Sequence, residues 1–139
     1  MNYTGYCDGA VRKPGASCAF VVYENGKEIY REGKFLGKNI TNNQAEYHSL
    51  RLGLEEAQKM GAREVAVHMD SLLVVNQMKG IFKVKNRDLW PIHGAIKQLV
   101  RSFEHVAFKQ IPRELNKLAD SAVNRTLDDE LKNSSQKLP

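Results

Sequence analysis

The hydrophobic pattern of this chain changes its period once, and that change constrains the fold more than any other feature of the sequence. Before residue 41, three runs of aromatic, β-branched and small residues indicate strands, at Tyr3–Asp8, Cys18–Tyr23 and Glu28–Leu36. After it, apolar residues recur three and four positions apart, the spacing of one buried helical face. The chain therefore begins with strands alone and continues with helices and strands in alternation.

The connections between the first three strands are expected to be short. Asn25-Gly26 separates the second run from the third. Asn-Gly is a strong hairpin signal, because both central turn positions need a positive φ. Gly9–Gly15 is expected to form the loop between the first two strands. Together these features predict an antiparallel meander.

A helix is predicted to start at Thr41-Asn42-Asn43-Gln44, which has the form of a capping box. Gly61 is expected to end it. Its apolar residues share one face: Tyr47, Leu50, Leu54 and Ala57.

The later elements alternate between helix and strand. They are a strand at Glu64–Met69, a helix at Leu72–Met78, a helix capped by Asp88 and carrying Leu89, Ile92, Ile96, Leu99 and Phe103, a strand at Val106–Ile111, and a helix at Leu115–Leu127 with Leu118, Ala122 and Val123 on its apolar side. The order β-β-β-α-β-α-α-β-α predicts an α/β fold with a five-stranded mixed sheet and helices on both faces. We expect one domain over residues 1–128 and a frayed C-terminal tail over 129–139.

The composition indicates which binding partners and which cellular compartment to expect. Lys and Arg outnumber Asp and Glu by 21 to 16, giving a net charge of +5, which favours a polyanionic partner such as nucleic acid. Two cysteines, Cys7 and Cys18, make no disulfide framework, and whether they pair stays open. No run approaches the ~20 apolar residues of a membrane span. We expect a cytoplasmic monomer without a membrane partner.

Four acids occupy positions where chemistry is expected. Asp8 and Asp70 close two strands of the predicted parallel set, Glu46 lies early in a helix, and Asp120 lies within the last helix. Ligands of such sheets bind outside the carboxyl ends of the parallel strands. Each acid also has a structural alternative: a turn residue for Asp8, a helix-dipole partner for Glu46, a cap for Asp70 and a solvated position for Asp120.

Carboxylates brought together from four elements repel one another unless cations lie between them. All-oxygen ligation suits Mg²⁺ or Mn²⁺, and a pair of such ions serves in-line displacement at phosphorus, with Asp8 as the bridging ligand. No Ser/His/Asp or Cys/His arrangement competes with this interpretation. The four histidines lie within predicted helices or strands: His48, His68, His93 and His105.

Four segments resemble the motifs of type 1 ribonuclease H, in the same order and at compatible spacing. They are Tyr6-Cys7-Asp8-Gly9, Thr41-Asn42-Asn43-Gln44-Ala45-Glu46, Asp70-Ser71 and Asn116-Lys117-Leu118-Ala119-Asp120. The resemblance, which covers Tyr3 to Leu127, implies the ribonuclease H-like fold. It also implies an endonuclease that cuts the RNA strand of RNA/DNA hybrids by two-metal-ion catalysis, leaving 5'-phosphate and 3'-hydroxyl ends. The metal-binding catalytic tetrad is then Asp8, Glu46, Asp70 and Asp120, with two Mg²⁺ or Mn²⁺ ions in the substrate complex.

The resemblance further implies a set of substrate-binding residues: Gly9, Thr41, Asn42, Asn43, Ser71 and Asn116. The asparagines and the backbone of Gly9 meet 2'-hydroxyls and base edges, and Thr41 holds a DNA phosphate. Amides suit a 2'-hydroxyl because they both donate to it and accept from it. Helix capping alone is the structural alternative for Thr41 and the two asparagines after it.

The chain departs from the family pattern in two places. Many members carry a His before the last Asp, where this chain has Arg113, similar to the Arg of members that lack the His. Arg113 is the candidate catalytic replacement, a permanent cation that can neutralise charge but is a poor general acid; a surface arginine is the alternative. The basic, Trp-bearing protrusion of many relatives is absent. A reduced phosphate grip is expected from Lys79, Lys83, Lys85 and Arg87 with Arg12 and Lys13, so hybrid binding should be weak and salt-dependent.

Three alternatives to this function stay open. The same metal site can act on double-stranded RNA or on RNA-DNA junctions, which a comparison of matched duplexes separates. A non-catalytic nucleic-acid-binding module on the same fold would bind hybrid without cutting it. A structural partner domain would show an uncharged or apolar cleft.

Overall fold

The structure is a computed structural model that describes residues 2–136. Its elements, in chain order, are β1 (Asn2–Arg12), β2 (Gly15–Glu24), β3 (Lys27–Gly37), α1 (Asn42–Lys59), β4 (Glu64–Met69), α2 (Leu72–Met78), the 3₁₀ turn η1 (Arg87–Leu89), α3 (Trp90–Arg101), β5 (His105–Gln110), the 3₁₀ turn η2 (Arg113–Leu115) and α4 (Lys117–Gln136).

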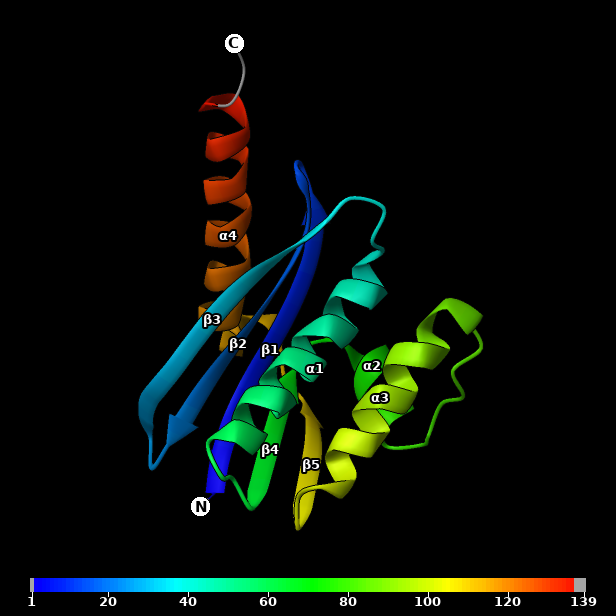
Figure 1. Ribbon diagram of the computed structural model, residues 1–139. Helices are drawn as coiled ribbons and strands as arrows, with labels where there is room; N and C mark the ends of the chain where they lie inside the picture. The colour runs from blue at the N-terminus through cyan, green and yellow to red at the C-terminus, as the bar shows by residue number, and fades with distance from the viewer. Residues whose placement is uncertain (1, 137–139) are drawn as a thin grey trace.

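The strands form one five-stranded sheet in the order β3-β2-β1-β4-β5. β2 pairs antiparallel with both β1 and β3, whereas β4 pairs parallel with both β1 and β5. Helices α1, α2 and α3 lie over one face, and α4 lies over the other, against β1, β2 and β3 (Figure 1). The α/β class, the mixed sheet and the order of the elements are confirmed.

The hairpin between β2 and β3 turns at the Asn-Gly pair. Asn25 has φ 53° and Gly26 has φ 77°, so both central turn residues adopt the left-handed conformation that this dipeptide tolerates. The predicted meander is therefore correct at its second connection.

The first connection differs from the prediction. β1 continues past Asp8 to Arg12, and Gly9 and Arg12 pair with Cys18 and Gly15 of β2. Small residues indicated a loop, but the cross-strand ladder and packing against both helical layers make this stretch a strand. The expected loop Gly9–Gly15 is thus reduced to a tight turn. The extension brings Arg12, at the end of β1, beside α4.

Helix α1 begins as the sequence predicts. The backbone N–H of Gln44 donates to Oγ1 of Thr41 at 3.1 Å, and the backbone N–H of Thr41 donates to Oε1 of Gln44 at 2.8 Å. This reciprocal pair is the capping box. The predicted apolar face is completely buried in the main core between α1, α3 and the sheet: Tyr47, Leu50, Leu54 and Ala57.

The start of α3 corrects another prediction. Asp88 does not cap this helix; it lies inside η1, where its backbone N–H donates to Oδ1 of Asn86 at 2.9 Å. The 3₁₀ turn thus intervenes between the polar cap and α3. Phe103 is buried in the core as expected, but it follows the end of α3.

The last helix also differs at both ends. Leu115 belongs to η2, and α4 continues to Gln136, so residues 129–136 of the expected tail are helical; residues 137–139 lie outside the described residues. Leu118 is 39% exposed, because it does not lie on the core face of α4. That face begins at Ala119 and continues with later residues three and four positions apart. Those residues pack under β2 with Ala19: Ala122, Val123 and Leu127.

Two smaller points concern the cysteines and the helices. Cys7 and Cys18 are both free and buried. Within residues 2–136, no helix combines the length and apolar character that crossing a membrane requires.

Candidate active site

Adjacent parallel strands place two of the acids side by side. Tyr6 of β1 is in register with His68 of β4, so Asp8 and Asp70 each lie two residues beyond the same pair. Asp8 is buried, whereas Asp70 is half-buried at the strand's carboxyl end. The cap of α2 is Ser71, whose hydroxyl accepts from the backbone N–H of Val74 at 3.2 Å. Asp70 is therefore not needed as a cap, and its structural alternative is excluded.

Glu46 reaches the same place from α1. It is 3% exposed, and its Oε1 accepts from the backbone N–H of Gly9 at 3.3 Å. A Cβ on Gly9 would lie 2.4 Å from the carbonyl carbon of Ala45, so only glycine lets β1 approach α1 this closely. The carboxyl oxygens of Asp8, Glu46 and Asp70 come within 4.8 Å of one another.

The pKa values of the two buried acids record this crowding. Burial raises the pKa of Asp8 from 3.8 to about 7, with further contributions from the charges of Asp70 and Asp120. Burial likewise raises the pKa of Glu46 from 4.5 to about 9, and the charges of Asp8 and Asp70 add to it. Metal-free, the site therefore favours retained protons on these acids.

Asp120 stands slightly apart from the other three acids. It is half-buried in the first turn of α4 and does not belong to the group that lies within 4.8 Å. Its charge nevertheless acts on Asp8. The amide of Asn124, one turn later, donates to Oδ1 of Asp120 at 3.3 Å.

The donor set fits a divalent cation. Oε2 of Glu46 is buried and has no hydrogen-bond partner among the residues that the structure describes. A buried carboxylate oxygen without a donor is costly, and a cation would satisfy it. Three carboxylates within reach of one another offer the hard oxygen ligands that Mg²⁺ and Mn²⁺ prefer.

The substrate-binding residues implied by the resemblance differ in their exposure and in their contacts. Asn42 is exposed at the start of α1, while Asn43 is half-buried and lines a cavity of about 510 Å³ with Leu73 and Phe82. The hydroxyl of Thr41 already serves the capping box. Arg113 is exposed in η2, the turn that precedes α4.

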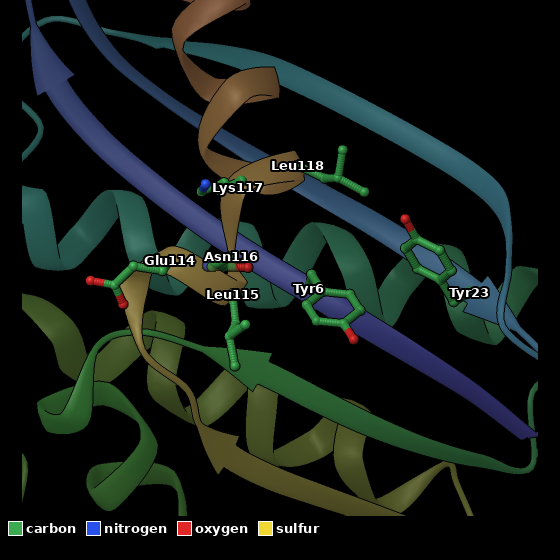
Figure 2. A pocket seen from close by; sticks show the side chains of 7 residues that line it. All are labelled: Tyr6, Tyr23, Glu114, Leu115, Asn116, Lys117 and Leu118. Atoms are coloured by element: carbon green, nitrogen blue, oxygen red, sulfur yellow. The ribbon is translucent and has the colours of Figure 1, made fainter.

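Asn116 is a buried residue and not a surface residue. It is 1% exposed, and its Nδ2 donates to the carbonyl oxygen of Cys7 at 2.8 Å, immediately before Asp8. This bond holds the start of α4 against β1. Asn116 also lines a hollow of about 380 Å³. Figure 2 shows the side chains around it, which include Tyr6, Tyr23 and two leucines. No member of the acidic group lines that hollow, which is therefore distinct from the carboxylate cluster.

The basic residues fall into two groups with different environments. Lys79, Lys83, Lys85 and Arg87 are all exposed in and around the segment between α2 and α3. Exposed aromatic side chains accompany them, with Phe82 at 44% and Trp90 at 52%. This aromatic component was missed from the sequence, although lysines interleaved with aromatic residues are a recognisable signal for nucleic-acid binding. Arg12, by contrast, is bound to α4, because its Nη2 donates to Oδ1 of Asp128 at 2.7 Å.

Comparison with known families finds relatives over most of the chain. Residues 2–126 match the protein family described as reverse transcriptase-like. A bifunctional protein of Mycobacterium tuberculosis is 38% identical over 115 residues, which are 83% of this chain and 32% of that protein. The chain thus spans about a third of the length of this mycobacterial relative. Ribonuclease HI of Halobacterium salinarum is 34% identical over 126 residues, 89% of this chain and 63% of that protein.

Solved structures agree with the sequence comparison. The crystal structure of the Halobacterium salinarum enzyme matches with a TM-score of 0.88 at 32% identity, over 93% of this chain and 99% of that one. LC11-RNase H1, solved in complex with an RNA/DNA hybrid, matches with a TM-score of 0.86 at 35% identity, over 93% of this chain and 99% of that one.

Proposed function

Because this chain belongs to the type 1 ribonuclease H family, we propose that it is a metal-dependent endonuclease that hydrolyses the RNA strand of RNA/DNA hybrids. The observation that carries the proposal is the convergence of Asp8, Glu46 and Asp70 within 4.8 Å, with Oε2 of Glu46 buried and unpaired among the described residues. A structural role for these acids leaves that convergence unexplained, since like charges repel. The proposed catalytic domain spans residues 1–128.

The metal ligands are Asp8, Glu46 and Asp70, joined by Asp120 from α4. We assign two Mg²⁺ or Mn²⁺ ions to the substrate complex. Such a pair supplies a water of lowered pKa and stabilisation of the charge that builds on the leaving oxygen. We assign 5'-phosphate and 3'-hydroxyl ends to the cleaved RNA.

The chain's own residues bind and orient the hybrid. Asn42, Asn43 and the backbone of Gly9 recognise the RNA strand through its 2'-hydroxyls, while Thr41 holds a DNA phosphate. Ser71 lies next to Asp70, and its hydroxyl caps α2. The burial of Asn116 supports a second role beside the proposed 2'-hydroxyl contact, because its amide anchors α4 to the strand that carries Asp8.

Arg113 is the proposed cationic residue of the leaving-group side. It is exposed and precedes α4, which carries Asp120. A guanidinium stays charged at all working pH values, so it stabilises negative charge without transferring a proton. Arg113→Lys should retain more activity than Arg113→Ala, because it keeps the charge.

Cleavage of a 5'-labelled RNA strand paired with DNA tests the proposal. Wild type should cut with Mg²⁺ or Mn²⁺ and not with EDTA, and Asp8→Asn should not cut. Asp129→Asn is the matched control, since that acid is exposed on α4. A folded wild type that binds hybrid but cuts nothing with either metal would establish the non-catalytic binding module instead. Matched double-stranded RNA and RNA-DNA junction substrates define the range.

A further inference from the structure

Asn124 is the residue whose side chain bonds the carboxylate of Asp120. Its Nδ2 donates to Oδ1 of Asp120 at 3.3 Å and to the backbone carbonyl of the same residue at 3.0 Å. The two residues are one turn apart on α4 and both are half-buried. Asn124 therefore contacts the one tetrad acid that lies outside the 4.8 Å group.

Arg12 decides which end of the Asn124 amide faces Asp120. Nε of Arg12 donates to Oδ1 of Asn124 at 3.3 Å, and its Nη2 donates to the backbone carbonyl of Asn124 at 3.2 Å. A guanidinium has only donors, so it takes the oxygen end of the amide. The nitrogen end is left to donate to Asp120.

The hydrogen bonds of Arg12 also connect β1, which carries Asp8, with α4, which carries Asp120. Arg12 ends β1, the strand that carries Asp8, and its Nη2 also donates to Oδ1 of Asp128 at 2.7 Å. Nearby, the hydroxyl of Ser17 on β2 donates to the backbone carbonyl of Val123 at 2.8 Å. Through these bonds the hairpin β1-β2 fixes the rotation of α4, and with it the side on which Asp120 is presented.

We propose that Asn124, oriented by Arg12, is a positioning residue that holds the Asp120 carboxylate toward the acidic site. The inference rests on the proposed function, since it assigns Asp120 to the metal site. Residues of this kind orient metal ligands without touching the metal, and their loss costs about 10- to 100-fold in activity or metal affinity.

Asn124→Asp separates positioning from simple structural support. The carboxylate has the shape of the amide and still accepts from Arg12, so the variant should unfold cooperatively with a thermal midpoint near that of wild type. It has no donor for Asp120 and places a like charge beside it. We expect kcat on the hybrid to fall by about 10- to 100-fold with KM nearly unchanged. Asn124→Asp with a wild-type kcat, alongside an Asp120→Asn variant whose kcat is lowered but still measurable, would overturn the proposal.

A double-mutant cycle tests whether Asn124 acts through Asp120. Asn124→Ala should lower kcat in the wild-type background and have no further effect in the Asp120→Asn background. Equal losses in both backgrounds would show an independent role and overturn the proposal. Asn133→Ala, at an exposed position on the same helix, controls for the change in helix propensity.

Metal binding gives a readout that does not depend on cleavage. In a Mn²⁺ titration followed by thermal midpoint without substrate, Asn124→Ala should need about tenfold more Mn²⁺ than wild type for the same shift. An unchanged titration curve would overturn positioning. If the wild type binds Mn²⁺ but cuts no hybrid, the proposed function fails, whereas this titration still decides the role of Asn124.

Discussion

The carboxyl groups of Asp8 and Glu46 lie within 4.8 Å of each other across the contact between β1 and α1, and the charge of Asp8 adds to the effect of burial in raising the pKa of Glu46. Burial is the largest cause at both positions, so the pKa of each acid is raised overall. The two carboxyl groups are therefore stable side by side while they hold a proton, and they repel each other when both ionise. A cation removes that repulsion, which links metal binding to stability.

Metal-free protein should lose stability as the pH rises through this pair. In the unfolded chain the two acids release protons near their ordinary values of 3.8 and 4.5, whereas the folded pair holds them toward about 7 and 9. A raised folded pKa contributes stability at low pH that is lost as the pH climbs through the folded values. Thermal unfolding in EDTA between pH 4 and pH 9 measures this, with the double variant Asp8→Asn, Glu46→Gln as reference. Parallel curves for the two proteins would contradict the prediction.

Asp8→Asn should stabilise the metal-free protein while abolishing cleavage. The amide removes a charge that repels Glu46, Asp70 and Asp120, and relieving a strained functional site commonly yields about 0.5–2 kcal/mol. Urea unfolding in EDTA measures the free energy of unfolding. With Mg²⁺ present the order should reverse, because wild type gains binding energy that the variant has lost. Asp129→Asn should change neither value by more than about 0.5 kcal/mol.

Gly9→Ala should damage both stability and activity. The new Cβ would lie 2.5 Å from the backbone nitrogen of Glu46, so β1 and α1 must separate. Overpacking of this kind costs about 1–3 kcal/mol, and it moves Glu46 away from Asp8. Gly94→Ala is the matched control, since its added Cβ would have no described atom within 4 Å apart from its chain neighbours and the backbone of α3, inside which it lies. That variant should gain up to about 1 kcal/mol in the free energy of unfolding. Equal effects of the two substitutions would argue against a close approach at Gly9.

Local chemistry made much of the fold predictable. The Asn-Gly turn, the capping box at Thr41 and the bounds of β4 depend on neighbouring residues, and the structure confirms all three. For the same reason, the expected meeting of Asp8, Glu46 and Asp70 could be inferred from the sequence, and the structure brings these three acids together. Asp8 lies within β1 and Asp70 follows β4, its parallel neighbour, while Glu46 reaches them from α1, whose start the capping box marks.

Other features depend on residues far apart in the chain and left no local signal. The sequence predicts a loop from Gly9, because glycine favours turns, whereas the pairing of Gly9 to Arg12 with β2 makes this stretch a strand. The bond between Arg12 and Asn124 joins positions 112 residues apart, so no spacing rule anticipates it. Leu118 was placed on the wrong side of α4, because the rotation of that helix is set by its packing on β2.

Hybrid binding should weaken steeply with salt, and Lys83 and Lys85 should account for part of the slope. Both lysines are exposed beside the aromatic side chains of Phe82 and Trp90, where a phosphate backbone can run. Each phosphate contact releases condensed counterions, so its loss reduces the slope of log affinity against log salt by about 0.9. We therefore expect Lys83→Gln, Lys85→Gln to raise KM at low salt and to flatten its salt dependence, with kcat little changed.

Lys59→Gln is the control for this prediction, because Lys59 is exposed at the far end of α1 from the capping box and pairs with Glu56. Removing it lowers the net charge by one without removing a phosphate contact. KM measured between 50 and 200 mM salt separates the two possibilities. A slope that falls by the same amount per charge removed in both variants would show that only the overall charge attracts the hybrid, whereas a slope that falls only in the Lys83, Lys85 variant shows contact at the segment between α2 and α3. In that case, the short segment takes over part of the DNA grip that many relatives place on an inserted protrusion.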